Sequence, residues 1–154
     1  MEDNLMTFKA AIAAFFSALG AFLGWQGIIA LVWVIVMALD YLTGTMAACH
    51  DGEWSSATAR EGLWHKGGMI FVVIVAGIAD FIMAMICANL PLSMVWPDLI
   101  LPLVLAWYII TELGSILENA VKMGASVPEW LVKLLKASVK VVDSTGESIT
   151  EKTE

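Results

Sequence analysis

The sequence predicts an all-α integral membrane protein with four transmembrane helices and a C-terminal basic amphipathic helix, and three observations lead to this fold class. Hydrophobic residues make up 60% and charged residues only 15% of the 154 residues, and the mean hydropathy is +0.83. No charged residue stands between Lys9 and Asp40, a run that a soluble domain of this size has no core to bury. Apolar stretches of roughly 20 residues, the length that crosses about 30 Å of hydrocarbon, recur along the chain. Together these features exclude a water-soluble globule, a disordered chain and a disulfide-rich secreted domain.

The first two spans are expected at about residues 7–25 and 27–48, separated by a Gly-containing break at 24–27. The first stretch is rich in alanine and glycine and therefore only moderately apolar, so its insertion into the membrane is the least strongly predicted of the four. A cleavable signal peptide is the alternative for it. Glu2 and Asp3 stand at the end where a signal peptide carries a basic cluster, which favours a retained helix.

The third and fourth spans are expected at about residues 67–90 and 95–117, and the four spans form a helical domain over residues 1–125. Four crossings place every basic residue on one side of the membrane, whereas three crossings place Lys9 or the loop carrying Arg60 and Lys66 opposite the basic C-terminal part. The positive-inside rule therefore predicts both termini in the cytoplasm. Arg60 and Lys66 are expected in a cytoplasmic loop at the membrane surface.

A separate amphipathic helix is predicted over residues 126–142, followed by a flexible acidic tail over 143–154. Gly124 suits a left-handed cap at the end of the preceding helix, and Pro128 suits the first turn of the new one. Trp130 and several leucines share one face, and three lysines share the other: Lys133, Lys136 and Lys140. Two placements stay open, an anionic inner leaflet bound by the basic face and packing on a neighbouring helix.

The polar residues outside these helix patterns give no sign of catalysis or of a cofactor. Cys49, His50 and His65 lack the paired spacing of a structural zinc site, so no metal is expected. No nucleophile, base and orienting group occur together, and an enzyme is the least expected class. The eight basic residues mostly flank apolar runs, where they report topology, so no nucleic-acid partner is expected.

Three acidic residues lie inside the predicted spans: Asp40, Asp80 and Glu112. A central Asp costs about 2.5 to 3.5 kcal/mol on insertion scales, and desolvation favours the protonated form of a carboxyl group. No basic residue is expected at their depth, so these acids should face a helix neighbour, another subunit or water. Ala76, Asp80 and Ala84 repeat every fourth residue, which predicts a helix-packing seam. The seam either joins copies of the chain or packs within one monomer.

Two separated blocks of sequence resemble the phage holins that are grouped with clostridial toxin-secretion holins. The first block comprises residues 40–45 (DYLTGT), 53–56 (EWSS) and 61–66 (EGLWHK), and the second comprises 108–109, 112, 115–120, 124 and 128–129. The similarity covers residues 25–136 approximately. It departs from the family pattern at Ala59, His65 and Thr111.

The resemblance implies a small protein of the bacterial inner membrane that oligomerises and opens lesions in a phage-infected or prophage-carrying cell. An endolysin, or a toxin in some relatives, escapes through the opening, and cytolysis follows. The implied partners are the lipid bilayer, further copies of the chain and an endolysin. We select Asp40, Tyr41, Gly44 and Glu112 as candidate residues for pore formation or oligomerisation. The resemblance implies no catalytic residue.

Two other functions stay open on the sequence alone. A small ion or solute channel, or a transporter subunit, would use the intramembrane carboxylates as ion ligands. A membrane-bound adaptor would use the loop from Cys49 to Lys66 to dock a partner.

Overall fold

The computed structural model describes residues 2–90 and 95–151, and within them the chain forms four helices. These are α1 (Glu2–His50), α2 (Ser56–Asn89), α3 (Ile100–Lys122) and α4 (Glu129–Glu151). The all-helical fold class is as predicted. The predicted connection between the third and fourth spans falls partly outside the description, because Pro91 is not among the described residues.

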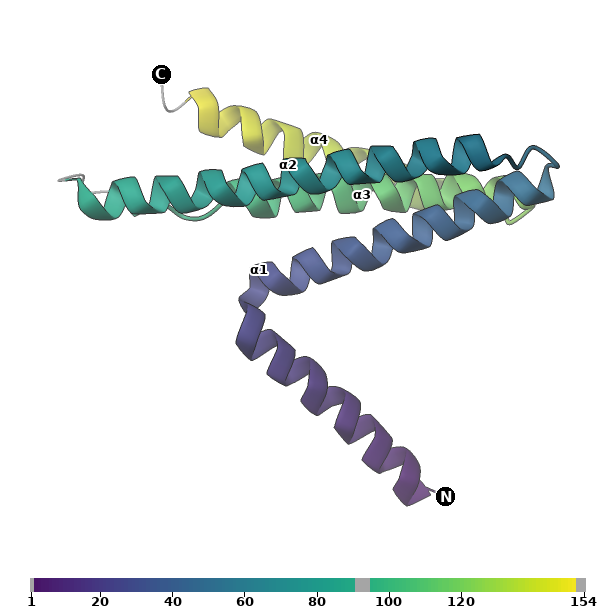
Figure 1. Ribbon diagram of the computed structural model, residues 1–154, viewed down its shortest axis with the longest axis horizontal. Helices are drawn as coiled ribbons and strands as arrows, with labels where there is room; N and C mark the ends of the chain where they lie inside the picture. Colours follow the sequence, from purple (N-terminus) through teal and green to yellow (C-terminus); the bar gives the residue numbers. More distant parts are fainter. Residues whose placement is uncertain (1, 91–94, 152–154) are drawn as a thin grey trace.

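The two predicted N-terminal spans belong to one bent helix. α1 runs for 49 residues, and its only non-helical backbone lies at Gly24, with φ of 67° and ψ of −177°. A left-handed φ of this kind is readily adopted by glycine and strained for residues with a Cβ atom, so Gly24 sets the position of the bend. Figure 1 shows the part of α1 before this bend projecting away from the other helices.

α3 is the centre of the bundle, because it contacts each of the other three helices. Its Leu105 is fully buried and packs with Trp33 of α1 and Met69 of α2 in the hydrophobic core. Tyr108 stacks on Trp33 with 6.1 Å between the ring centroids. The second half of α1 runs beside α2 and α3 in Figure 1, and this core fixes how the three helices are aligned along their lengths.

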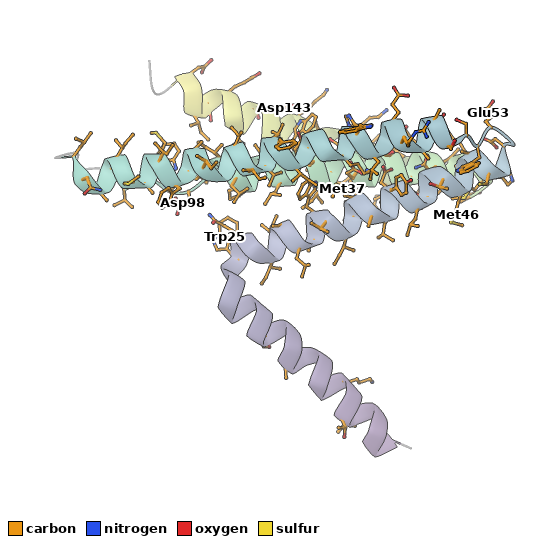
Figure 2. All side chains as sticks on the ribbon, in the orientation of Figure 1. Trp25, Met37, Met46, Glu53, Asp98 and Asp143 are labelled. Atoms are coloured by element: carbon orange, nitrogen blue, oxygen red, sulfur yellow. The ribbon has the colours of Figure 1, made fainter. Side chains whose placement is uncertain are left out.

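Three helical segments within the described residues are long and apolar enough to cross a membrane: Gly24–His50, Ser56–Asn89 and Ile100–Lys122. Their outward side chains are uncovered, as Phe71 and Phe81 show with exposures of 72% and 67%. Such a surface matches lipid tails, and Figure 2 shows side chains extending outward along these helices. The predicted segment 7–25 is helical but is not among these three, so a fourth crossing stays a prediction.

The helices have other boundaries than the spans predicted within them, and the span boundaries stay a prediction. α2 begins at Ser56, before the span expected from about residue 67, because the side chain of Ser55 accepts a hydrogen bond from the Thr58 backbone N–H at 3.1 Å and caps the helix there. α3 runs from Ile100 to Lys122, whereas the expected span covers about 95–117. Because α2 begins this early, Lys66, which is expected in the loop, lies in the helix and is buried in the bundle.

The connection from α3 to α4 follows the predicted left-handed cap. Gly124 has a φ of 90°. The backbone N–H of Gly124 donates to Val121 O at 2.9 Å and that of Ala125 donates to Ala120 O at 3.0 Å, the two bonds of a Schellman motif. The turn leads into α4, which packs against α3. α4 continues to Glu151, beyond the predicted boundary at 142, so residues 143–151 are helical.

Candidate functional site

A buried ionic cluster joins the three candidate spans near the α1–α2 loop. The Lys66 Nζ atom of α2 lies 2.8 Å from Asp40 Oδ2 of α1 and 2.6 Å from Glu112 Oε2 of α3. The three side chains are only 11%, 15% and 7% exposed. The expectation that no basic residue accompanies the intramembrane acids is therefore wrong for Asp40 and Glu112. Lys66 is in the bundle because α2 begins well before the predicted span, and its expected place in a cytoplasmic loop is corrected too.

Asn119 of α3 extends the cluster toward the end of α1. Its Nδ2 atom donates to Asp40 Oδ1 at 3.4 Å and to Thr43 Oγ1 at 3.3 Å. Thr43 in turn donates to the backbone oxygen of Asp40 at 3.1 Å. A Cβ atom added to Gly44 would meet Asn119 Nδ2 at 3.5 Å, so the glycine lets the two helices approach at this level.

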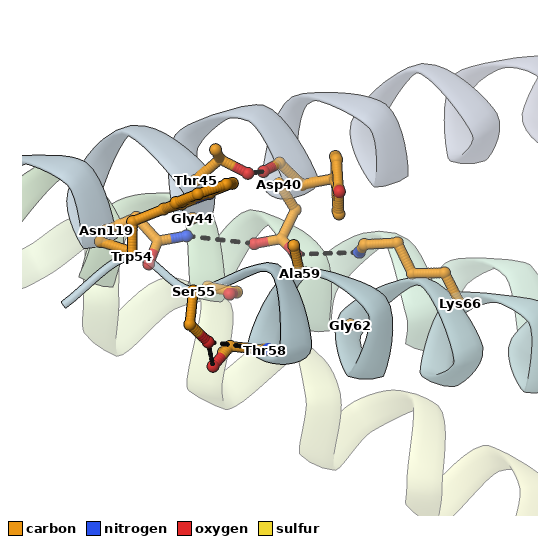
Figure 3. A pocket seen from close by; sticks show the side chains of 13 residues that line it. Asp40, Gly44, Thr45, Trp54, Ser55, Thr58, Ala59, Gly62, Lys66 and Asn119 are labelled. Atoms are coloured by element: carbon orange, nitrogen blue, oxygen red, sulfur yellow. Dashed lines mark hydrogen bonds and ion pairs between the residues drawn. The ribbon is translucent and has the colours of Figure 1, made fainter.

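A cavity of about 240 Å³ opens beside the cluster, and Figure 3 shows it from close by. Its lining comes from α1, the start of α2 with Trp54 and Ser55 before it, and α3. Three of the four positions singled out from the sequence line it: Asp40, Tyr41 and Gly44. The fourth, Glu112, is joined to it through Lys66. The structure thus brings these predicted residues together, while their functional role stays a prediction.

Sequence reasoning did not select Lys66, Ser115 or Asn119 as members of this site. Ser115 and Asn119 line the cavity and follow Glu112 by three and seven residues. This spacing places all three on one face of a helix, so the signal was present in the sequence. The signal for Lys66 was chemical, because two carboxyl groups at similar depth stabilise a cation between them.

The cluster is suited to holding helices together and gives no set of groups for bond chemistry. One ammonium group faces two carboxylates, so both acids have a charged partner within the chain. Removing one partner of a buried ion pair typically costs about 3–5 kcal/mol, because the remaining charge is left without compensation. Alignment of α1, α2 and α3 at this level therefore depends on all three side chains.

Asp80 is satisfied in a different way, at the other end of the bundle. Asp80 is buried, with 5% of its surface exposed. The carboxylate accepts hydrogen bonds from Trp96 Nε1 at 2.8 Å and from the backbone N–H groups of Ile100 and Leu101 at 3.1 and 2.7 Å. Leu99, at the N-cap of α3, makes no side-chain capping bond. Asp80 therefore caps a helix to which it does not belong, where the helix dipole also favours negative charge.

The rest of the predicted seam and surface residues lie apart from the ionic cluster. Ala76 is buried and Ala84 is half-buried on α2, on the side of Asp80. Arg60 is exposed in the second turn of α2. The remaining surface candidates are exposed on α4: Trp130, Lys133, Lys136 and Lys140.

The described residues offer no group of three His, Cys, Asp or Glu side chains able to hold a metal ion. Cys49 is exposed and Cys87 is buried, and both are free thiols.

Comparison with known proteins gives one family and several relatives of unknown role. The bacteriophage holin family matches residues 17–139. An uncharacterized protein of Listeria innocua is 30% identical over 127 residues, covering 82% of this chain and 83% of its own. An uncharacterized protein of Halalkalibacterium halodurans is 30% identical over 129 residues, covering 84% and 90%. An uncharacterized 14.9 kDa protein in the nagH 3' region of Clostridium perfringens is 31% identical over 103 residues, covering 67% and 70%. No solved structure is significantly similar.

Proposed function

The chain belongs to the bacteriophage holin family, and from this membership we propose that it oligomerises in the bacterial inner membrane and opens lesions that release an endolysin or a toxin. The resemblance found in the two sequence blocks is confirmed by the family match over residues 17–139. The holin family is not an enzyme family. We therefore assign the polar side chains of the chain to assembly.

The observation that carries the proposal is the buried ionic cluster that joins three lipid-compatible helices near the α1–α2 loop, where Lys66 pairs with both acids. Lys66 compensates Asp40 and Glu112 within one chain, so a single copy presents mainly apolar side chains to lipid. Buried charges of this kind are costly to separate in hydrocarbon but not in water. At high surface density, copies that share a wet lumen regain water for these groups. Accumulation of the chain then favours the open assembly.

The proposed orientation places the α1–α2 loop in the cytoplasm. Arg60 at the start of α2 and Lys122 at the end of α3 lie toward the same end of the bundle, because α1, α2 and α3 alternate in direction (Figure 1). The positive-inside rule assigns that end to the cytoplasm. A crossing by residues 7–25 would bring Lys9 to the same side and both termini into the cytoplasm.

For α4 we propose a second position, on the inner leaflet. α4 packs against α3, which agrees with the packing alternative for this helix. Large apolar side chains of α4 are nevertheless uncovered, with Trp130 at 66%, Leu134 at 54% and Val141 at 64% exposure. These three residues fall on one stripe of the helix, and the lysines beside them suit anionic headgroups. The leaflet would thus cover a surface that α3 leaves open.

Co-expression with a cytoplasmic muralytic enzyme tests the proposed function. We expect abrupt clearing of the culture only when both proteins are present, because the enzyme alone cannot reach the cell wall. Cells with either protein alone are the controls. Purified chain in liposomes should release an enclosed folded enzyme. Passage of ions with retention of the enzyme would instead indicate a selective channel and contradict the lesion.

A further inference from the structure

We propose that a groove between α1 and α2 binds one anionic phospholipid, with its phosphate on Arg60 and one acyl chain between the helices. The groove encloses about 600 Å³. Its lining is mostly apolar and includes Val34 and Met37 of α1 and Leu63, Trp64 and Ile70 of α2. This site goes beyond lesion formation, because it would be filled in the single resting copy.

The shape of the groove matches one leaflet of a bilayer. The lining residues of α2 follow one another at helical spacing from Arg60 to Ile70. At about 1.5 Å per residue this stripe is roughly 15 Å long, about half of the roughly 30 Å of hydrocarbon. Arg60 lies nearest the α1–α2 loop and Ile70 lies deepest. Figure 2 labels Met37 on the facing helix, α1. An acyl chain that starts at the membrane surface would fill this length.

The charge of the groove selects a phosphate group. Two cations line it, Arg60 and Lys66. Lys66 is neutralised by Asp40 and Glu112. Arg60 is exposed, and no carboxylate pairs with it in the part of the chain that the structure describes. A free guanidinium group binds phosphate with two parallel hydrogen bonds. Arg60 is therefore the anchor available for a headgroup.

The same lining favours an anionic lipid over a zwitterionic one. None of the residues that line the groove is an aspartate or glutamate, so no carboxylate in it would pair with the ammonium group of a choline or ethanolamine headgroup. Trp64, one turn below Arg60, has 82% of its surface exposed. Tryptophan is enriched at the headgroup level of bilayers, which sets the depth of this end of the groove. Phosphatidylglycerol has the required chemistry.

The test is lipid retention by the full chain in mild detergent, measured by native mass spectrometry after reconstitution with equal parts phosphatidylglycerol and phosphatidylcholine. We expect preferential retention of one phosphatidylglycerol. Arg60→Gln should lower this retention about fivefold, since each basic side chain near an anionic headgroup contributes about 1 kcal/mol. Lys122→Gln is the matched control, because Lys122 is an exposed cation outside the groove. It should retain the lipid as the parent chain does.

A second pair of variants tests the acyl-chain part of the groove. Gly67 lines the groove, whereas its neighbour Gly68 does not, and a Cβ atom at either position meets nothing within 4 Å. Gly67→Leu should therefore fold and fill the groove, lowering retention of phosphatidylglycerol. Gly68→Leu adds the same side chain outside the groove and should leave retention unchanged.

Several results would overturn the proposal. Equal retention of the two lipids, or unchanged retention in Arg60→Gln, would remove the phosphate contact. Displacement by inorganic phosphate at the concentration of lipid would assign Arg60 to free anions. Loss of oligomers in Gly67→Leu with lipid retention unchanged would assign the groove to a second copy. Because these measurements need no lysis, they are independent of the co-expression result.

Discussion

The two ends of the bundle satisfy their buried acids by different means. Near the α1–α2 loop, Asp40 and Glu112 are held by one lysine side chain from a third element. At the opposite end, Asp80 accepts its hydrogen bonds from an indole and from two backbone N–H groups of α3. The first arrangement depends on one charged side chain and borders a cavity. The second depends on backbone that is fixed by its own helix.

This difference separates acids that can change partners from an acid that serves the fold. Lys66 can exchange the carboxylates of Asp40 and Glu112 for water or for a carboxylate of another copy without unwinding a helix. The N–H groups at the start of α3 have no intrahelical acceptor, so they hold Asp80 for as long as α3 exists. If the chain opens lesions as proposed, the change of partners should occur at the Lys66 end. Asp80 would then act as an anchor for the N-terminal end of α3.

The largest effect is expected for Lys66→Met. This change leaves two carboxylates buried without a cation, and the free energy of unfolding in mild detergent should fall by about 3–5 kcal/mol. A denaturant titration with SDS checks it. The chain offers a matched control in Lys133→Met, because Lys133 is 78% exposed and lies 3.4 Å from an exposed glutamate. Its unfolding should not differ measurably from that of the parent.

A rescue variant distinguishes charge from packing in the same cluster. Replacing Asp40 by Asn and Glu112 by Gln in the Lys66→Met background removes both uncompensated charges while keeping their size. Stability should return close to that of the parent chain, since neutral replacement of a whole buried ion cluster is often tolerated. A triple variant as unstable as Lys66→Met would show that the ammonium stem, and not the charge, holds the helices.

A smaller and local effect is expected at Asp80. Asp80→Ala removes the acceptor of three donors, and because the N–H groups at the start of α3 can turn to water instead, we expect a total loss of stability of about 1–3 kcal/mol. Asp80→Asn keeps one acceptor oxygen and should lose less. Hydrogen exchange of a peptide that contains Ile100 and Leu101 should rise in the order parent, Asn, Ala. Asp98→Asn, which removes a carboxylate of the same connection outside these contacts, is the control.

The time at which cultures with the Asp80→Asn chain lyse tests the proposed distinction between the Lys66 end and the Asp80 end of the bundle. If the Asp80 end serves only as an anchor, cultures that express Asp80→Asn with the muralytic enzyme should clear at the same time as cultures with the parent chain. The comparison requires that the variant and the parent chain accumulate to the same level. A shifted time at unchanged expression would bring Asp80 into the opening step and remove the distinction between the two ends.

The sequence contains most of the fold and part of the site. Apolar runs predict four spanning helices because hydrocarbon demands length and composition, and three helices in the described part of the chain meet both demands. Gly124 predicts the turn before α4 because glycine readily takes its backbone conformation. Asp40, Tyr41 and Gly44 were selected together and line one cavity. The partner Lys66 was missed, because one capping bond at Ser55 decides where α2 begins. The periodicity of one helix does not predict which residues of a neighbouring helix lie beside it, because the alignment of two helices along their axes depends on both.

The bend in α1 shows the same limit at larger scale. The glycines at 24 and 27 predict an interruption, and an interruption is what the structure has, at Gly24. Whether two segments that flank a break fold back on each other or continue in a new direction depends on side chains elsewhere. Here residues after the bend pack on α3 through Trp33, whereas the part before it projects away (Figure 1).

The smallest effect on stability is expected for Gly44→Ala. This variant tests whether the side chains around the ionic cluster pack closely and can still move. The added Cβ atom would meet Asn119 Nδ2 at 3.5 Å, an ordinary contact. Replacing a helical glycine by alanine should add about 1 kcal/mol of stability. Gly114→Ala on α3 has open space at its Cβ and supplies the same helix propensity without the contact. Unfolding titrations of the two variants should agree within about 0.5 kcal/mol if Asn119 yields without strain. A Gly44→Ala chain that is less stable than the parent would show that Asn119 cannot move, and a cluster that rigid could not exchange its partners during lesion formation.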